Sequence, residues 1–277
     1  MKRILKGSYI VAMACSACWW CGCKKSANVS FAPEETVTDL AQTYLYYSMI
    51  FREAEHAWAL IDHRQYPAEP VTETGANGAQ RIFTWVETEE GKPELTVEYR
   101  AWTWGTATLA GKLTMNMPGK DLYRESGKTA TVNFTGFSIN RQNIAGYANI
   151  TRAAAGDDGA DRYNYSFNNS SIYDETGQQV IIASTMTNGS LTRVEGGDTH
   201  PVQEDDTWSF TGSMSGTLRN NISLKYSNAV SEPLFYEWAC GRKAMKGRCT
   251  LTVNRQEIIY DYGASCNSQI SIGYITK

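Results

Sequence analysis

A period-two alternation of side chains runs from about residue 81 to the C-terminus and constrains the fold more than any other feature. Residues 82–87 and 95–104 alternate on either side of a turn at Glu90-Gly91-Lys92. Two such segments joined by a tight glycine-containing turn indicate an antiparallel hairpin. The pattern recurs near residues 107–117, 128–135, 144–152, 162–168, 179–187, 207–218, 221–228, 247–254, 256–262 and 268–276. The sequence therefore predicts a mainly β fold, a large antiparallel meander forming a curved open sheet or a sandwich.

One amphipathic helix is predicted ahead of this region, over residues 36–64. Apolar residues recur three and four positions apart, at Val37, Leu40, Tyr44, Tyr47, Phe51, Ala54, Trp58 and Ile61. Thr36 with Asp39 resembles a capping box, and Pro67 stops the helix. The stripe also fits a coiled coil, but it holds bulky aromatic residues and no second helix is evident. We therefore expect the helix to lie across a face of the sheet, followed by a loop over 66–80.

The N-terminus has the composition of an export signal. Residues 1–7 are basic, residues 8–22 are apolar and uncharged, and the run ends at Gly22-Cys23. The apolar run is short for a bilayer span, which needs about 20 residues. A small residue before a cysteine resembles a bacterial lipobox, which implies cleavage before Cys23 and acylation of its thiol. Trp20 stands where the pattern prefers Leu, and an ordinary signal peptide or an uncleaved anchor are the alternatives.

These signals divide the chain into a lipoprotein signal peptide (1–22), a tether (23–32) and a single domain (33–277). Two or three acyl chains on one cysteine make release from a membrane slow. Lys24 replaces the aspartate that resembles an inner-membrane retention signal. The expected location is therefore the outer membrane, on its periplasmic or its surface side.

The charge of the chain argues against nucleic acid as a partner. The net charge is −3, and loss of Lys2, Arg3 and Lys6 with the leader takes it to −6. Affinity for nucleic acid comes mainly from neutralising phosphates, and the chain shows no basic stripe.

No motif predicts catalysis, a metal or a cofactor. Glu53 and His56 form a Glu-x-x-His pair on the predicted helix, but a di-iron centre needs matching ligands from other helices. A solvated or core histidine is the favoured interpretation. Three cysteines follow Cys23 without a histidine nearby, which makes a poor zinc site. We therefore predict a protein that is not an enzyme, with a hydrolase of unrecognised site as a less favoured alternative.

Three tryptophans are the candidate ligand-binding residues. In a hairpin register centred on Glu90-Gly91, Trp85, Trp102 and Trp104 share one face. Rings on one face can stack on sugars, whereas packing beneath the helix is the favoured alternative.

The last third of the chain carries a spaced pattern of Cys, Gly and aromatic residues: Cys240-Gly241-Arg242, then Gly247-Arg248-Cys249-Thr250-Leu251-Thr252-Val253, then Asp261-Tyr262-Gly263-Ala264-Ser265-Cys266-Asn267. It resembles the C-terminal end of a group of uncharacterised β-rich lipoproteins from gut-type two-membrane bacteria, which share a DYGxxC[DN] turn. Segments 127–146 and 210–220 resemble the hairpin unit of that group. The resemblance covers roughly residues 95–277 and implies a lipid-anchored β protein, but no activity.

The same resemblance implies a disulfide between Cys240 and Cys266, with Cys249 buried and free. An exported domain meets oxidising conditions, and an odd number of cysteines leaves one thiol over. A Cys249–Cys266 bridge is the alternative. Cys249 departs from the pattern of the group, which has a Ser- or Thr-like residue there.

The function expected from these features is a non-catalytic interaction or structural role in the cell envelope. The expected partners are a membrane, held through the N-terminal lipid, and another envelope protein. A surface glycan-binding lipoprotein is the alternative.

Overall fold

The fold was analysed in a computed structural model. The structure describes residues 46–47, 49–58, 68–87, 93–104, 107–117, 125–154, 161–195, 207–218, 223–228, 231–237, 246–253, 255–265 and 267–275. The chain divides into a unit of residues 1–31 and a unit of residues 32–277, and every described residue belongs to the second unit. The signal peptide, Cys23 and the tether therefore lie outside the described residues.

The second unit is mainly antiparallel β structure with one short N-terminal helix, as predicted. The helix covers residues 46–47 and 49–58. The strands are β1 (Val71–Thr74), β2 (Gln80–Glu87), β3 (Pro93–Trp104), β4 (Ala107–Asn116), β5 (Thr129–Asn133), β6 (Phe137–Ile139), β7 (Gln142–Arg152), β8 (Arg162–Tyr173), β9 (Gln179–Glu195), β10 (Thr207–Leu218), β11 (Ser223–Asn228), β12 (Leu234–Glu237), β13 (Arg248–Val253), β14 (Gln256–Asp261) and β15 (Ser271–Ile275).

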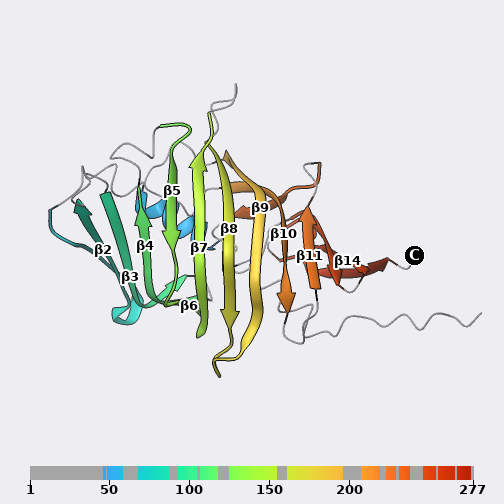
Figure 1. The fold of residues 1–277 in the computed structure, drawn as a ribbon, viewed down its shortest axis with the longest axis horizontal. Coiled ribbons are helices and arrows are strands. Elements are labelled where there is room, and N and C mark those ends of the chain that lie inside the picture. Colours follow the sequence, from blue (N-terminus) through green and yellow to red (C-terminus); the bar gives the residue numbers. More distant parts are fainter. Residues whose placement is uncertain are drawn as a thin grey trace, which may run out of the picture. The chain divides into compact units, whose positions relative to one another are not determined.

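The strands follow one another across the fold as a meander. They form two antiparallel sheets of nine and six strands, which backbone hydrogen bonds join into a continuous path from β1 to β15. Strand β6 pairs with both β4 and β7, while β12 pairs with β10. The strands β2 to β11 can be followed side by side in Figure 1. Most neighbours in the sheet are therefore neighbours in the sequence, as the regular turns predict.

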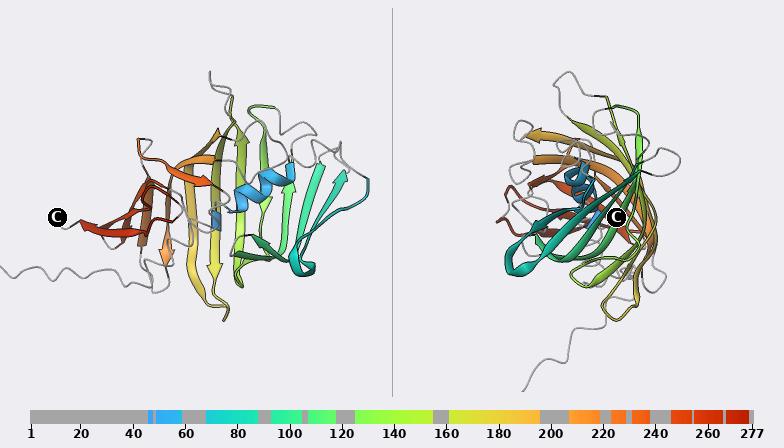
Figure 2. Two further views of the ribbon diagram at one scale, coloured as in Figure 1. Left: turned by 180° about the vertical axis from the view of Figure 1, so that it is seen from behind. Right: turned by 90° about the vertical axis from the view of Figure 1, so that its left-hand side faces the viewer.

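The helix lies on the concave face of the curved sheet (Figure 2). The ring of Tyr47 stacks on Phe167 of β8 with centroids 4.1 Å apart. The ring of Phe51 meets Tyr163 of β8 and Trp208 of β10 at 5.3 Å and 5.5 Å. Aromatic pairs in these orientations add about 0.5–1.5 kcal/mol each beyond the area they bury. The predicted packing of the helix against the sheet is thus confirmed over its described residues.

The expectation of a helix with one buried stripe is wrong over these residues. Every described helix residue is buried, including Arg52, Glu53, Glu55 and His56. The cause is the curvature of the sheet, because strands on either side of the helix close over its polar flank as well. Buried charges are stable only when they are paired, and the sheet supplies partners for Glu53.

Three strands were not predicted. Strand β1 and a short 3-10 turn, Ala76–Gly78, occupy part of the loop expected over 66–80. Strands β6 and β12 are three and four residues long, too short for an alternation to register. Strand β9 also runs to Glu195, beyond the predicted end at residue 187.

Candidate functional site

A row of three polar side chains crosses strands β1, β2 and β3. Arg81 on β2 pairs directly with Glu73 on β1 and with Tyr99 on β3 in the antiparallel ladders. Side chains directly opposite each other in a sheet have Cβ atoms about 4.5–5.5 Å apart. Burial of Arg81 and Tyr99 places the row on the inner face, where it meets the helix.

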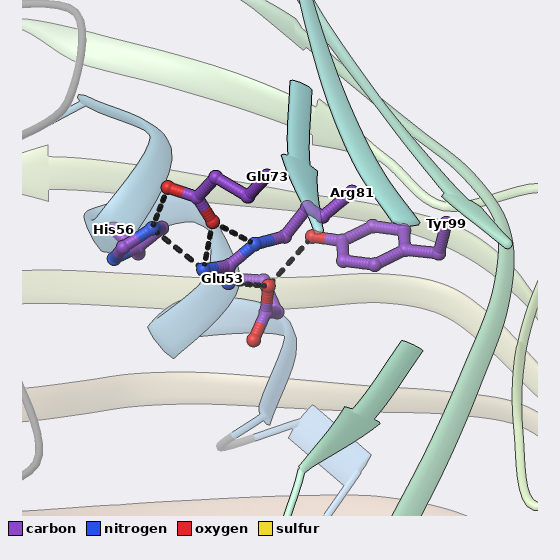
Figure 3. A network of polar contacts seen from close by, with 5 residues as sticks. All are labelled: Glu53, His56, Glu73, Arg81 and Tyr99. Carbon is purple, nitrogen blue, oxygen red and sulfur yellow. Dashed lines mark hydrogen bonds and ion pairs between the residues drawn. The ribbon is translucent and has the colours of Figure 1, made fainter. Parts of the chain in front are cut away.

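The helix adds Glu53 and His56 to this row, one turn apart (Figure 3). Nη1 of Arg81 donates to Oε2 of Glu53 at 2.9 Å, and the hydroxyl of Tyr99 donates to the same oxygen at 2.8 Å. Nε and Nη2 of Arg81 both donate to Oε2 of Glu73, at 2.8 Å and 2.5 Å. One guanidinium therefore joins a helix carboxylate to a strand carboxylate.

Aromatic rings enclose the cation. The guanidinium carbon of Arg81 lies 4.6 Å from the ring centre of Trp102 and 5.5 Å from that of Phe83. The side chains of Arg81 and Glu53 are 3% and 1% exposed, whereas that of Glu73 is 24% exposed. Glu73 is therefore the side of the network nearest to water.

His56 contacts two groups with opposite demands. Its Nε2 lies 2.7 Å from Nη2 of Arg81 and 3.4 Å from Oε1 of Glu73. A guanidinium only donates and an ionised carboxylate only accepts, so Nε2 can serve one of them at a time. The shorter contact assigns Nε2 as an acceptor and places the proton on Nδ1. That buried Nδ1 has no hydrogen-bond partner within the described part of the chain.

The network keeps both carboxyl groups ionised. Burial alone would raise the pKa of Glu73, but its contact with His56 and the positive charge of Arg81 lower that pKa to about 2. Burial opposes the ionisation of Glu53 too, yet the charge of Arg81 holds its pKa below the ordinary value. The pKa of Tyr99 is raised well above the usual range, first by burial and then by the charge of Glu53. Tyr99 therefore stays a neutral donor.

This arrangement acts as a clamp between the helix and the first three strands. The described acid and base groups are already bonded to one another, so the site resembles a structural ion-pair network more than a reaction centre. No group of three or more His, Cys, Asp or Glu side chains that could hold a metal occurs among the described residues. We name Glu53, His56, Glu73, Arg81 and Tyr99 the buried clamp.

The predicted tryptophan platform is not an exposed face. Trp85 and Trp102 are half-buried and pack against the core. The register centred on Glu90-Gly91 is wrong, because Trp85 pairs with Leu95 and the ladder centres on residue 90. A β-bulge at Ala101, whose φ is 51°, shifts the phase of β3 and returns Trp102 to the core side. A ligand-binding role for these residues stays a prediction.

Trp104 and the cysteines are described only in part. Trp104 pairs with Ala107 in the ladder, and its side chain lies outside the described residues. Cys240 and Cys266 also lie outside them, so their predicted disulfide stays a prediction. Cys249 is buried and free, as expected, which excludes the alternative bridge to Cys266. Burial raises the pKa of the Cys249 thiol to about 12.

Two sequence signals pointed to the buried clamp. The Glu53–His56 spacing was recognised as a possible pair, and the structure places the pair in the core, as one favoured interpretation held. Arg81 is in phase with Phe83 on β2, so its side chain points inward. The predicted strand began at residue 82, which hid that phase. Glu73 lies in the unpredicted β1, and so no carboxylate was available to pair with Arg81.

Comparisons with known proteins add no relative. The chain matches no family model, no curated protein and no solved structure. No helix in the described residues is both long and apolar enough to cross a membrane. The resemblance to uncharacterised β-rich lipoproteins therefore stays a prediction.

Proposed function

We propose that this chain is a non-catalytic lipoprotein of the bacterial outer membrane that acts by binding other envelope components. The observation that carries the proposal is the mutual pairing of the buried clamp. A catalytic carboxylate needs a substrate within reach and a pKa near the working pH. Glu53 is bonded to Arg81 and Tyr99 in the interior, and the pKa of Glu73 is about 2. Neither group meets those requirements.

The anchor rests on the sequence. A basic start, an apolar run and Gly22-Cys23 precede a tether of residues 23–32. A lipid on Cys23 would hold the β unit beside a membrane, where a binding face meets its partner at high local concentration. The resemblance to β-rich lipoproteins of two-membrane bacteria supports the same address.

Metabolic labelling tests the anchor. Cells that express the full chain are grown with an alkyne-bearing fatty acid, and the label on the protein is measured after membrane fractionation. Cys23→Ser is expected to abolish the label, while the matched variant Cys21→Ser keeps it. Label that survives Cys23→Ser, or an unlabelled wild type, would overturn the anchor.

Protease shaving of intact cells then decides which partners the domain can meet. Peptides from residues 66–277 released from intact cells would place the domain at the cell surface, beside external ligands. Peptides protected until the outer membrane is opened would place it in the periplasm, where the partner is another envelope protein. Crosslinking in cells followed by mass spectrometry identifies that partner, and repeated recovery of no partner in either compartment would contradict the binding role.

A further inference from the structure

The outward face of strands β5, β7 and β8 carries nine side chains without a formal charge, which we name the neutral array. The ladders place them in three rows across the strands. The rows are Asn133–Tyr147–Asn168, Thr131–Asn149–Ser166 and Thr129–Thr151–Asn164.

The array faces away from the core. The alternate residues of the same strands are buried, namely Ala130, Val132, Ala148, Ile150, Tyr165 and Phe167. All nine array residues are exposed or half-buried. In Figure 1 the helix lies behind β5 and β7, and in the reverse view of Figure 2 it lies in front of them. The array therefore occupies the face opposite the helix.

The composition of the array departs from that of an ordinary solvated face. Charged residues make up 20% of the chain, and designed soluble surfaces carry roughly 25–35%. About two of nine accessible neighbours would then be charged, whereas the array has none. At its centre row edge stands Tyr147, with 39% of its surface exposed. Depletion of charge and enrichment of tyrosine mark the cores of binding interfaces.

The polar groups of the array are held in place by one another. The hydroxyls of Thr129 and Thr151 lie 2.7 Å apart, and the hydroxyl of Thr131 donates to Oδ1 of Asn149 at 3.0 Å. The strands beneath them are fixed by the core. A ligand that binds here would therefore lose less side-chain entropy than on a surface of free rotamers.

We infer that the neutral array binds a neutral glycan chain. Hydroxyl and amide groups supply both donors and acceptors, and the exposed ring of Tyr147 offers an apolar face for a sugar ring. Groups repeat about every 4.8 Å across the strands and about every 6.8 Å along them, which is the scale of one sugar unit. The inference rests on the proposed function, because it names the ligand class of a non-catalytic binding protein.

The charge of the array sets the choice of ligand. Nucleic acids and anionic lipids are held by lysine and arginine, which the array lacks. A protein partner needs a cluster of apolar anchors, and Tyr147 is the single large apolar side chain in the nine. An uncharged polyhydroxylated chain matches both properties.

The test uses the full-length chain in detergent and native gels that contain dextran, mannan or galactan, with heparin as the anionic control. Retardation by at least one neutral polysaccharide is expected. Tyr147→Ala and Asn149→Ala should each weaken the binding about tenfold or more. Tyr274→Ala is the matched control, because Tyr274 on β15 is 41% exposed and lies outside the array. Circular dichroism melting checks that each variant is folded.

Retardation by heparin alone, by none of the three neutral polysaccharides, or equally for wild type and both folded array variants would overturn the inference. Failure here is separable from failure of the proposed function. A chain that is labelled at Cys23 but ignores every neutral glycan contradicts the array and leaves the anchor standing. A chain that binds glycan without a label contradicts the anchor alone.

Discussion

The guanidinium of Arg81 on β2 lies 2.9 Å from the carboxylate of Glu53 on the helix, and both side chains are almost completely shielded from water. A buried pair adds little net stability, because removing two charges from water costs about as much as their attraction returns. Removal of one partner has a much larger effect, since the other charge is left unpaired. The position of the helix on the sheet therefore depends on both residues being present.

Replacement of the cation should unfold the protein more easily. Arg81→Met leaves Glu53 buried without its counter-charge and removes the bonds to Glu73. The free energy of unfolding is expected to fall by about 3–5 kcal/mol, as measured by urea denaturation.

Arg100→Met is the matched control for that variant. Arg100 forms an ion pair with Glu98 at 2.7 Å, but both side chains are well exposed. An exposed pair contributes about 0–1 kcal/mol. Equal losses for the two variants would show that burial does not set the cost of breaking the Arg81 pair.

Acid should weaken the buried clamp in a defined range. The pKa of Glu73 is about 2 in the folded chain, against an ordinary value of 4.5. A depressed folded pKa contributes stability that is complete above about pH 4.5 and is lost as the pH falls toward 2. The lowered pKa of Glu53 acts in the same direction. Urea denaturation across this range should show a steeper fall for wild type than for Glu73→Gln, and parallel curves would contradict the assignment.

Two glycines in the left-handed region should differ in their tolerance of alanine. Gly111 has φ +89°, and an added Cβ would lie 2.0 Å from the carbonyl oxygen of Gly136. Gly127 has φ +81° but open space around the same position. Gly127→Ala is expected to cost about 1–2 kcal/mol from backbone strain alone. Gly111→Ala should cost about 3 kcal/mol or more, because the neighbouring backbone must move as well. Similar melting temperatures for the two variants would contradict the close approach.

The Cys249 thiol should resist alkylation in the folded protein. Burial raises its pKa to about 12, and the reactive species is the thiolate. Iodoacetamide labelling followed by peptide mass spectrometry should show Cys249 unmodified in native protein and modified in urea. Rapid labelling of the native chain would contradict its burial.

The regular part of the fold follows from the sequence, and the irregular part does not. Strands such as β4 and β7 were recognisable because one face is apolar along their length. Strand β1 lies between Pro70 and Gly75 and has only four residues, so its local sequence resembles a loop. Its pairing with β2 is set by the ladder from Val71 to Thr74 rather than by its own pattern.

The buried clamp was beyond sequence reasoning for a related reason. Its members come from the helix and three strands, and each contact depends on register. Trp102 illustrates the difficulty, because a single bulge at Ala101 decides which face its ring occupies. The helix pattern likewise shows an apolar stripe, but only the curvature of the sheet reveals that Glu53 is covered as well.

A double-mutant cycle between Glu53 and Arg81 tests most directly whether the cluster is a structural clamp. The unfolding free energies of wild type, Glu53→Gln, Arg81→Met and the double variant give the coupling energy between the two residues. We predict that Glu53→Gln alone is destabilising and that the coupling is about 2–3 kcal/mol. A coupling near zero, or a Glu53→Gln variant more stable than wild type, would contradict the clamp and indicate a carboxylate held at a cost in stability for a functional purpose.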